Sequence, residues 1–168
     1  SVQGIAQSYL GEHDAALALL EPAVADNAQA HSKRGLGVLW GSLAIVHQRM
    51  GKNEAAREAY EAALQAAESA NDAWNVATTR LNLAGIERQR GDLAKAIDHL
   101  EAAIEMGERA GASLCVLQAR LNLANLDLYL GRLAHARGLI DAITRQGKTL
   151  SDDARLQLAG LDAEYAER

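Results

Sequence analysis

Hydrophobic residues along the chain recur at steps of three and four residues, the spacing of one face of an α-helix. One such series is Leu36, Leu39, Leu43, Val46 and Met50. Another consists of Leu93, Ala96, Ile97, Leu100, Ala103 and Ile104. A run of polar residues around a glycine separates neighbouring series, so the pattern predicts amphipathic helices joined by short connections.

Four glycines punctuate this pattern at intervals of forty residues: Gly11, Gly51, Gly91 and Gly131. An alanine stands five residues after each of them, and a glycine or alanine stands seven residues before. Glycine adopts the left-handed backbone conformation at almost no cost, so it suits the tight end of a helix. We therefore expect each glycine to join two antiparallel helices, with the small residues where the helices cross closely.

Whole segments also repeat, as in RLNLAGIERQRG at 80–91 and RLNLANLDLYLG at 120–131. The repeat predicts units of about 1–32, 33–72, 73–112 and 113–150, followed by a terminal helix at 151–168 that contains RLQLAGLD. That helix is either a cap or the first half of a further unit. Repeats of this length form solenoids, in which each unit buries its apolar face against its neighbours.

The order of small residue, glycine turn, alanine, large apolar residue and alanine resembles the tetratricopeptide repeat, most closely at 81–105. The resemblance implies an all-α, right-handed solenoid of stacked antiparallel helix pairs whose first helices line a concave groove. The family's usual period is about 34 residues, so longer helices or longer connections must absorb six extra residues in each unit here. Forty-residue variants are familiar from bacterial signalling proteins, transcription regulators and polarity adaptors, which implies that the chain is part of a larger regulatory protein.

Analogy with the family also assigns the positions that face the groove. The candidate contacts for a bound peptide are Tyr9, Ile45, Gln48, Arg49, Thr78, Leu81, Arg88, Gln89, Gln118, Asn125, Leu128 and Tyr129. Tyr9 and Tyr129 could equally pack between adjacent units. We expect Arg80 and Arg120, at equivalent positions, to make local salt bridges or to cover apolar surface with their stems rather than to contact a ligand.

Composition and charge narrow the class of partner. The chain has 17 basic and 22 acidic residues, a formal charge of -5, with both signs dispersed, which argues against binding to duplex nucleic acid. Net acidity favours partners with basic groups. The longest uncharged stretch, at 35–48, is too short to span a bilayer. The single cysteine, Cys115, cannot form an internal disulfide and is predicted to be a small core residue. A reducing compartment is the simplest assumption, so we expect a cytoplasmic protein.

Residues suited to catalysis are scattered. Five histidines lack the spacing of metal ligands, and no nucleophile stands in a pattern that would activate it. The segment GLGVLWG at 35–41 has neither type of phosphate-loop spacing. The sequence therefore predicts a binding module without catalytic residues, metal or cofactor. Two alternatives remain: a sensor segment that binds a small effector, and self-association through the ends of the solenoid.

Overall fold

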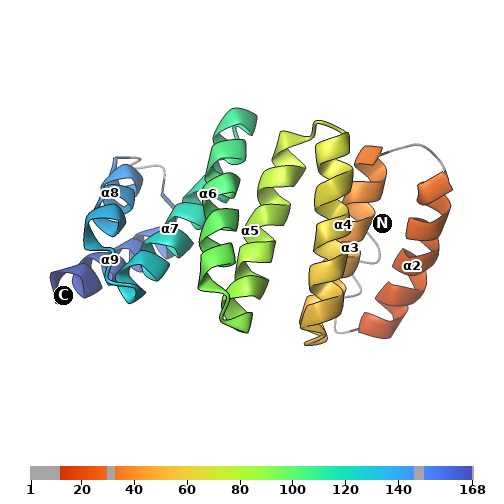
Figure 1. Cartoon of the computed structure of the whole chain (residues 1–168), viewed down its shortest axis with the longest axis horizontal. Coiled ribbons are helices and arrows are strands. Elements are labelled where there is room, and N and C mark those ends of the chain that lie inside the picture. Colours follow the sequence, from red (N-terminus) through yellow and green to blue (C-terminus); the bar gives the residue numbers. More distant parts are fainter. Residues whose placement is uncertain (1–11, 30–32, 146–149, 168) are drawn as a thin grey trace.

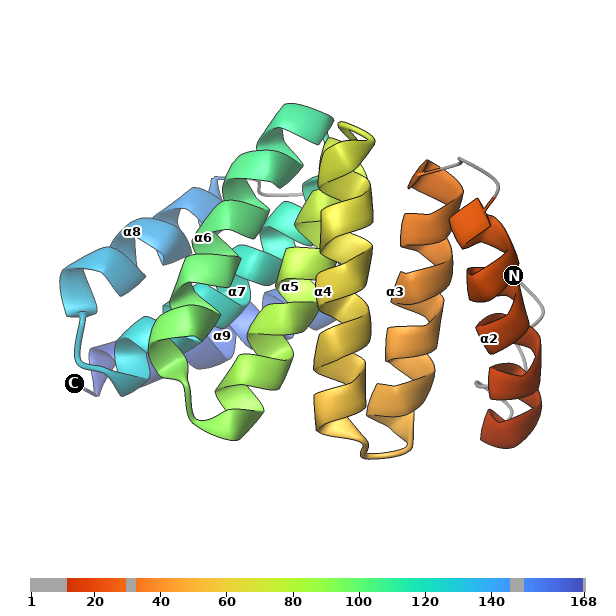
Figure 2. The same ribbon diagram turned by 45° about the vertical axis from the view of Figure 1, so that its right-hand side comes forward.

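A computed structural model describes residues 12–29, 33–145 and 150–167 of the chain (Figure 1). All regular secondary structure in these residues is α-helical, and the helices follow one another as a stack (Figures 1 and 2). They are α2 (His13–Gln29), α3 (Lys33–Arg49), α4 (Asn53–Ser69), α5 (Ala73–Arg90), α6 (Leu93–Ala110), α7 (Ser113–Tyr129), α8 (Leu133–Thr144) and α9 (Asp152–Ala166). The predicted all-α solenoid of stacked antiparallel helix pairs is confirmed.

The repeated glycines are the corners of helical hairpins. Gly51, Gly91 and Gly131 have φ angles of 71°, 82° and 71°, in the left-handed region that favours glycine. They join α3 to α4, α5 to α6 and α7 to α8, and each of these pairs is in close contact. Gly11, the first of the series, lies outside the described residues. The predicted role of the other three glycines as tight corners is confirmed.

The connections between hairpins explain how the forty-residue period is accommodated. In the unit that begins at Ala73, α5 and α6 contain 18 residues each, so long helices rather than long connections take up the period. A second left-handed corner ends the hairpins α3–α4 and α5–α6, with φ of 52° at Asn71 and 67° at Gly111. Asp72 then caps α5 by accepting a hydrogen bond from the backbone N–H of Asn75 at 3.2 Å.

The core follows the repeated alanines. All four alanines that stand five residues after the glycines are fully buried: Ala16, Ala56, Ala96 and Ala136. The large apolar residue four positions further on is buried as well, at Leu20, Tyr60, Leu100 and Ile140. The side chains lie between the two helices of a hairpin and between successive hairpins, which gives a continuous core along the stack.

The stack has two unlike sides. The first helices of the hairpins contact one another in succession, α3 with α5, α5 with α7 and α7 with α9. Among the described helices no comparable contact joins α4 to α6 or α6 to α8. The second helices are therefore spread apart, and the first helices form the inner side of the curve. In Figure 1 the outer helices α6 and α8 lie in front of α7 and α9.

Candidate ligand-binding groove

A cleft opens on the inner side where three first helices meet. It has a volume of about 470 Å³ and is lined by residues of α5, α7 and α9, among them Arg88, Asn125 and Gln157. A smaller cleft of about 350 Å³ adjoins it. Arg88 and Asn125 line both clefts, and Tyr129 also lines the smaller one. Arg88 and Asn125 thus belong to both hollows, which makes them the centre of this part of the groove.

A more apolar hollow lies nearer the beginnings of α5 and α7. It has a volume of about 530 Å³ and is lined by Trp74, Thr78 and Leu81 on one side and by Leu114 and Cys115 on the other. Trp74 is 54% exposed and Leu114 is 82% exposed. The two occupy equivalent positions in successive units, one helical turn before Thr78 and Gln118. They offer large apolar contact area to a ligand.

Exposed large apolar side chains are not spread evenly over the helices. On first helices they are Val38, Trp74, Leu114, Tyr129 and Leu156, and Leu130 follows directly at the end of α7. On the second helices of the described hairpins there is one, Leu19 of α2. A folded protein gains nothing in stability from keeping such groups in water, and a concentration of them on one side is a common feature of binding surfaces.

The structure brings together only part of the set that the family resemblance assigned to the groove. Thr78, Leu81, Arg88, Asn125 and Tyr129 line the hollows described above. Tyr129 is 68% exposed, so it does not pack between units. Tyr9 lies outside the described residues.

Other members of the set have structural partners or lie apart from the hollows. Gln48 accepts a hydrogen bond from the buried Tyr60 hydroxyl at 3.1 Å, and the Gln118 amide donates to Asn122 at 3.4 Å. Ile45 packs against the core between α3 and α4. Arg49 and Gln89 are exposed but line none of these hollows.

Leu128 is not a groove residue, contrary to the assignment by analogy. Its side chain is fully buried, in the core cluster that also contains Leu158 and Leu161 of α9. Leu121, two turns earlier on the same helix, is buried in the same cluster and forms part of the wall of the cleft of about 470 Å³. The cause is α9, which follows α7 more closely in sequence than the forty-residue register requires and packs against it.

Sequence reasoning missed two kinds of groove residue. Trp74 and Leu114 stand at the first turn of their helices, outside the apolar stripe, and only their shared register in the repeat marks them. Gln157, Gly160 and Glu164 of α9 reach the groove because that helix completes the wall of the cleft of about 470 Å³. The sequence signal for this position is the spacing of RLQLAGLD, which begins at 155, only 35 residues after the start of RLNLANLD at 120.

The arginines of the first helices differ in whether their side chains have a partner within the protein. Arg80 pairs with Glu68 at 3.0 Å, and Arg120 pairs with Glu108 at 2.5 Å, the same contact in two successive units. The predicted local salt bridges are thus present. The guanidinium of Arg88 is exposed and has no ion pair or hydrogen bond within the described residues, whereas every other arginine there interacts with another group.

Burial displaces the pKa of three side chains, and one of them, Cys115, lines the apolar hollow. Burial lowers the pKa of His99, and the nearby Arg80 lowers it further. Burial likewise lowers the pKa of His47 and raises the pKa of the Cys115 thiol. In the described part of the chain no group of three or more histidine, cysteine or acidic side chains could hold a metal ion. The groove thus presents apolar surface, amide groups, the Arg88 guanidinium and the Glu164 carboxylate, all of which can contact a ligand.

None of the described helices combines the length and the apolar character needed to cross a membrane.

Comparison with known proteins agrees with this geometry. Two family models described as tetratricopeptide repeat match residues 75–140 and 38–69. The crystal structure of BtubC (BKLC) from P. vanneervenii is similar with a TM-score of 0.82 and 19% identity, over 95% of this chain and 69% of that one. A structure from Podosopora anserina, described as a kinesin light chain with nearly identical TPR-like repeats, has a TM-score of 0.77 and 20% identity, over 99% and 85%. A singly substituted form of that protein gives 0.79 and 19%, over 99% and 84%. No curated protein matches the sequence.

Proposed function

Because the chain belongs to the tetratricopeptide repeat family, we propose that it is a non-catalytic module whose inner groove binds a peptide or an extended segment of another protein. Repeats of this family generally mediate protein–protein interaction. The proposal places the binding surface on the first helices, from Trp74 to Tyr129, and makes the chain the recognition part of a larger regulatory protein.

The observation that carries the proposal is the concentration of exposed apolar side chains on the inner side. Trp74 and Leu114 flank a hollow of about 530 Å³, which suits a large side chain of a bound segment. Asn125 and Gln157 supply amides in the cleft of about 470 Å³ on the same side of the stack, where they can hydrogen-bond a peptide backbone. Apolar anchors with polar groups around them are the usual make-up of a peptide-binding site.

The test is selection of ligands from random linear peptides displayed on phage, followed by affinity measurement with fluorescein-labelled copies. Peptides that bind the groove should lose roughly tenfold or more in affinity when Trp74→Ala and Leu114→Ala are combined, because large anchors dominate such interfaces. Leu19→Ala is the matched control, since Leu19 is an exposed leucine on α2, away from the groove. Circular dichroism should show the same helix content for all three proteins.

Other results would point elsewhere. Selected peptides that bind the double variant as tightly as the parent protein would contradict the groove. A concentration-dependent mass in solution that the double variant retains would favour self-association through the ends of the stack. An increase in melting temperature with a metabolite, in the absence of peptide binding, would favour effector sensing.

A further inference from the structure

We propose that the segment bound in the groove is acidic, with carboxylates placed to meet Arg88 and apolar residues placed to meet Trp74 and Leu114. This inference rests on the proposed function and names the chemistry of its ligand. It comes from the distribution of charge between the two sides of the solenoid.

The first helices α3, α5 and α7 present no acidic group to solvent. α3 contains neither aspartate nor glutamate. The single acidic residue of α5, Glu87, is 4% exposed, and the single one of α7, Asp127, is fully buried. The exposed charges on these three helices are basic: Lys33, Arg34, Arg49, Arg88 and Arg90.

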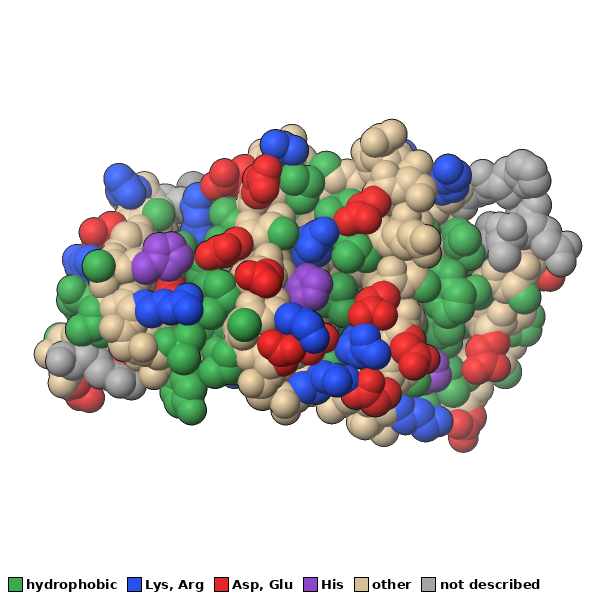
Figure 3. Space-filling view, in the orientation of Figure 1, with side chains coloured by type: hydrophobic (Ala, Val, Ile, Leu, Met, Phe, Trp, Pro, Cys, Tyr) green, Lys and Arg blue, Asp and Glu red, His purple; other side chains and the backbone are tan. Residues whose placement is uncertain are grey.

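The second helices show the opposite. α4 and α6 together carry eight exposed carboxylates: Glu54, Glu58, Glu61, Glu68, Asp98, Glu101, Glu105 and Glu108. Acidic side chains gather over these two helices on the outer face seen in Figure 3. α9 adds further acidic charge with Asp152, Asp153, Asp162 and Glu164, so the net charge of -5 comes from α4, α6 and α9 and does not describe the surface of α3, α5 and α7. The expectation that an acidic protein binds basic partners therefore does not apply to the surface of α3, α5 and α7.

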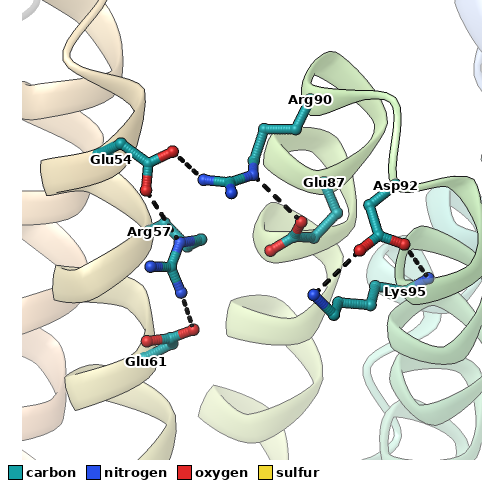
Figure 4. Close-up of polar contacts among 7 residues, drawn as sticks. All are labelled: Glu54, Arg57, Glu61, Glu87, Arg90, Asp92 and Lys95. Carbon is teal, nitrogen blue, oxygen red and sulfur yellow. Dashed lines mark hydrogen bonds and ion pairs between the residues drawn. The ribbon is translucent and has the colours of Figure 1, made fainter.

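Several other basic groups of these helices and their neighbours are already matched by acids. Figure 4 shows Arg90 between Glu54 of α4 and Glu87 of its own helix, with Glu54 also bound to Arg57. In the same view Lys95 lies 2.9 Å from Asp92. Arg34 likewise lies 2.8 Å from Asp72.

Arg88 is different because it lines both adjoining clefts and has no acidic partner among the described residues. A carboxylate of a bound segment would supply that partner, and Asn125 beside it can donate a second hydrogen bond. Apart from Arg88, the one charged residue that lines either cleft is Glu164 of α9, at the far wall of the larger one. We therefore expect the acidic part of the ligand to lie towards α5, away from α9.

A nucleic acid would also carry negative charge, but the surface favours a peptide. Phosphate backbones are held by several cations along a strand, whereas a single unpaired arginine stands here between apolar hollows. Trp74 and Leu114 match the apolar side chains of a peptide.

The test repeats the phage selection with the parent protein and with Arg88→Glu. The parent protein should enrich peptides in which aspartate or glutamate accompanies a large apolar residue. These peptides should bind Arg88→Glu roughly tenfold or more weakly, since a charge-assisted hydrogen bond is lost and repulsion replaces it. Added sodium chloride should weaken binding to the parent protein.

Arg109→Glu is the matched control, because Arg109 is an exposed arginine on the outer helix α6. It should leave the affinity for the selected peptides unchanged. Both charge-reversed proteins should keep the melting temperature of the parent within a few degrees, since the two side chains are exposed.

Each alternative outcome has a distinct meaning. Selected peptides that are neutral or basic, yet lose binding with Trp74→Ala and Leu114→Ala, would overturn the acidic ligand and leave the proposed function intact. Absence of any peptide that depends on these two residues would overturn both. Binding of a labelled oligothymidine that is lost with Arg88→Glu would replace the peptide with a nucleic acid.

Discussion

Nδ1 of His135 lies 2.5 Å from Oδ2 of Asp127, a carboxylate that is fully buried. The contact joins α8 to α7 across the Gly131 corner. The other carboxylate oxygen of Asp127 has no hydrogen-bond partner and lies 3.8 Å from the Arg132 guanidinium. The imidazole is therefore the main side-chain partner of a buried carboxyl group in the core of this hairpin.

We expect His135→Ala to reduce the free energy of unfolding by about 1–3 kcal/mol, because a buried acceptor loses its partner. His135→Lys should retain most of the stability, since the preceding unit has Glu87 and Lys95 at the equivalent positions. Urea denaturation of the two variants measures the difference. Equal losses for alanine and lysine would show that the imidazole contributes through packing alone.

Replacing the glycine of a left-handed corner between hairpins should reduce stability even where a side chain would have room. A Cβ atom at Gly111 would meet no atom within 4 Å, but its φ of 67° disfavours other residues. Gly111→Ala should therefore cost about 1–2 kcal/mol through backbone strain. Gly111→Asn should cost less, because Asn71 takes the same conformation one unit earlier. Thermal unfolding of both variants tests this, and identical stability of all three proteins would contradict it.

The repeated salt bridges should make small and similar contributions. Double-mutant cycles on Arg80 with Glu68 and on Arg120 with Glu108 should each give a coupling of about 0.2–1 kcal/mol, typical of partly exposed pairs. Added salt should reduce both couplings. Urea denaturation of the single and double alanine variants provides the cycle. A large coupling in only one pair would mean that the two contacts are not equivalent.

We expect the partly buried His99 to make the protein less stable in mild acid. Burial and Arg80 hold its pKa below the usual value in the folded chain, so the unfolded chain binds a proton more readily. Stability is then fully present above the usual histidine pKa and falls as the pH drops through the lowered one. His99→Leu should reduce this fall, and Leu139 at the equivalent position shows that the site accepts leucine. Urea midpoints at about pH 8 and about pH 5.5 measure the effect.

His47 provides the internal comparison for that experiment. Its pKa is also lowered by burial, with Lys52 acting in the same direction and Glu21 opposing it. The His99→Leu protein should therefore keep part of the acid sensitivity, and removal of both imidazoles should reduce it further. An unchanged pH dependence in His99→Leu would contradict the role given to His99.

The fold could be predicted from the sequence because one local rule repeats along it. Gly51, Gly91 and Gly131 each require a left-handed corner, and the alanines after them permit close helix crossing. These constraints act within a single hairpin, so the sequence reveals them directly. The corner at Asn71 was less visible, because asparagine is tolerated there rather than required.

The groove residues were predictable only in part. Whether a side chain is exposed depends on helices that pack from other units, and the pattern within one unit does not specify them. Arg88 and Asn125 follow from the register of the repeat. Leu128 occupies the same register as Arg88, yet α9 helps to bury it. The position of α9 follows from the departure from the forty-residue spacing, and that departure changes both the core and the wall of the cleft.

The absence of surface carboxylates from α3, α5 and α7 gives the molecule an electric moment across its width. On a positively charged support the acidic helices α4 and α6 would adhere first, and Arg88 would face the liquid. Simple adsorption would thus orient the protein with its recognition side outwards, without any tag or chemical coupling.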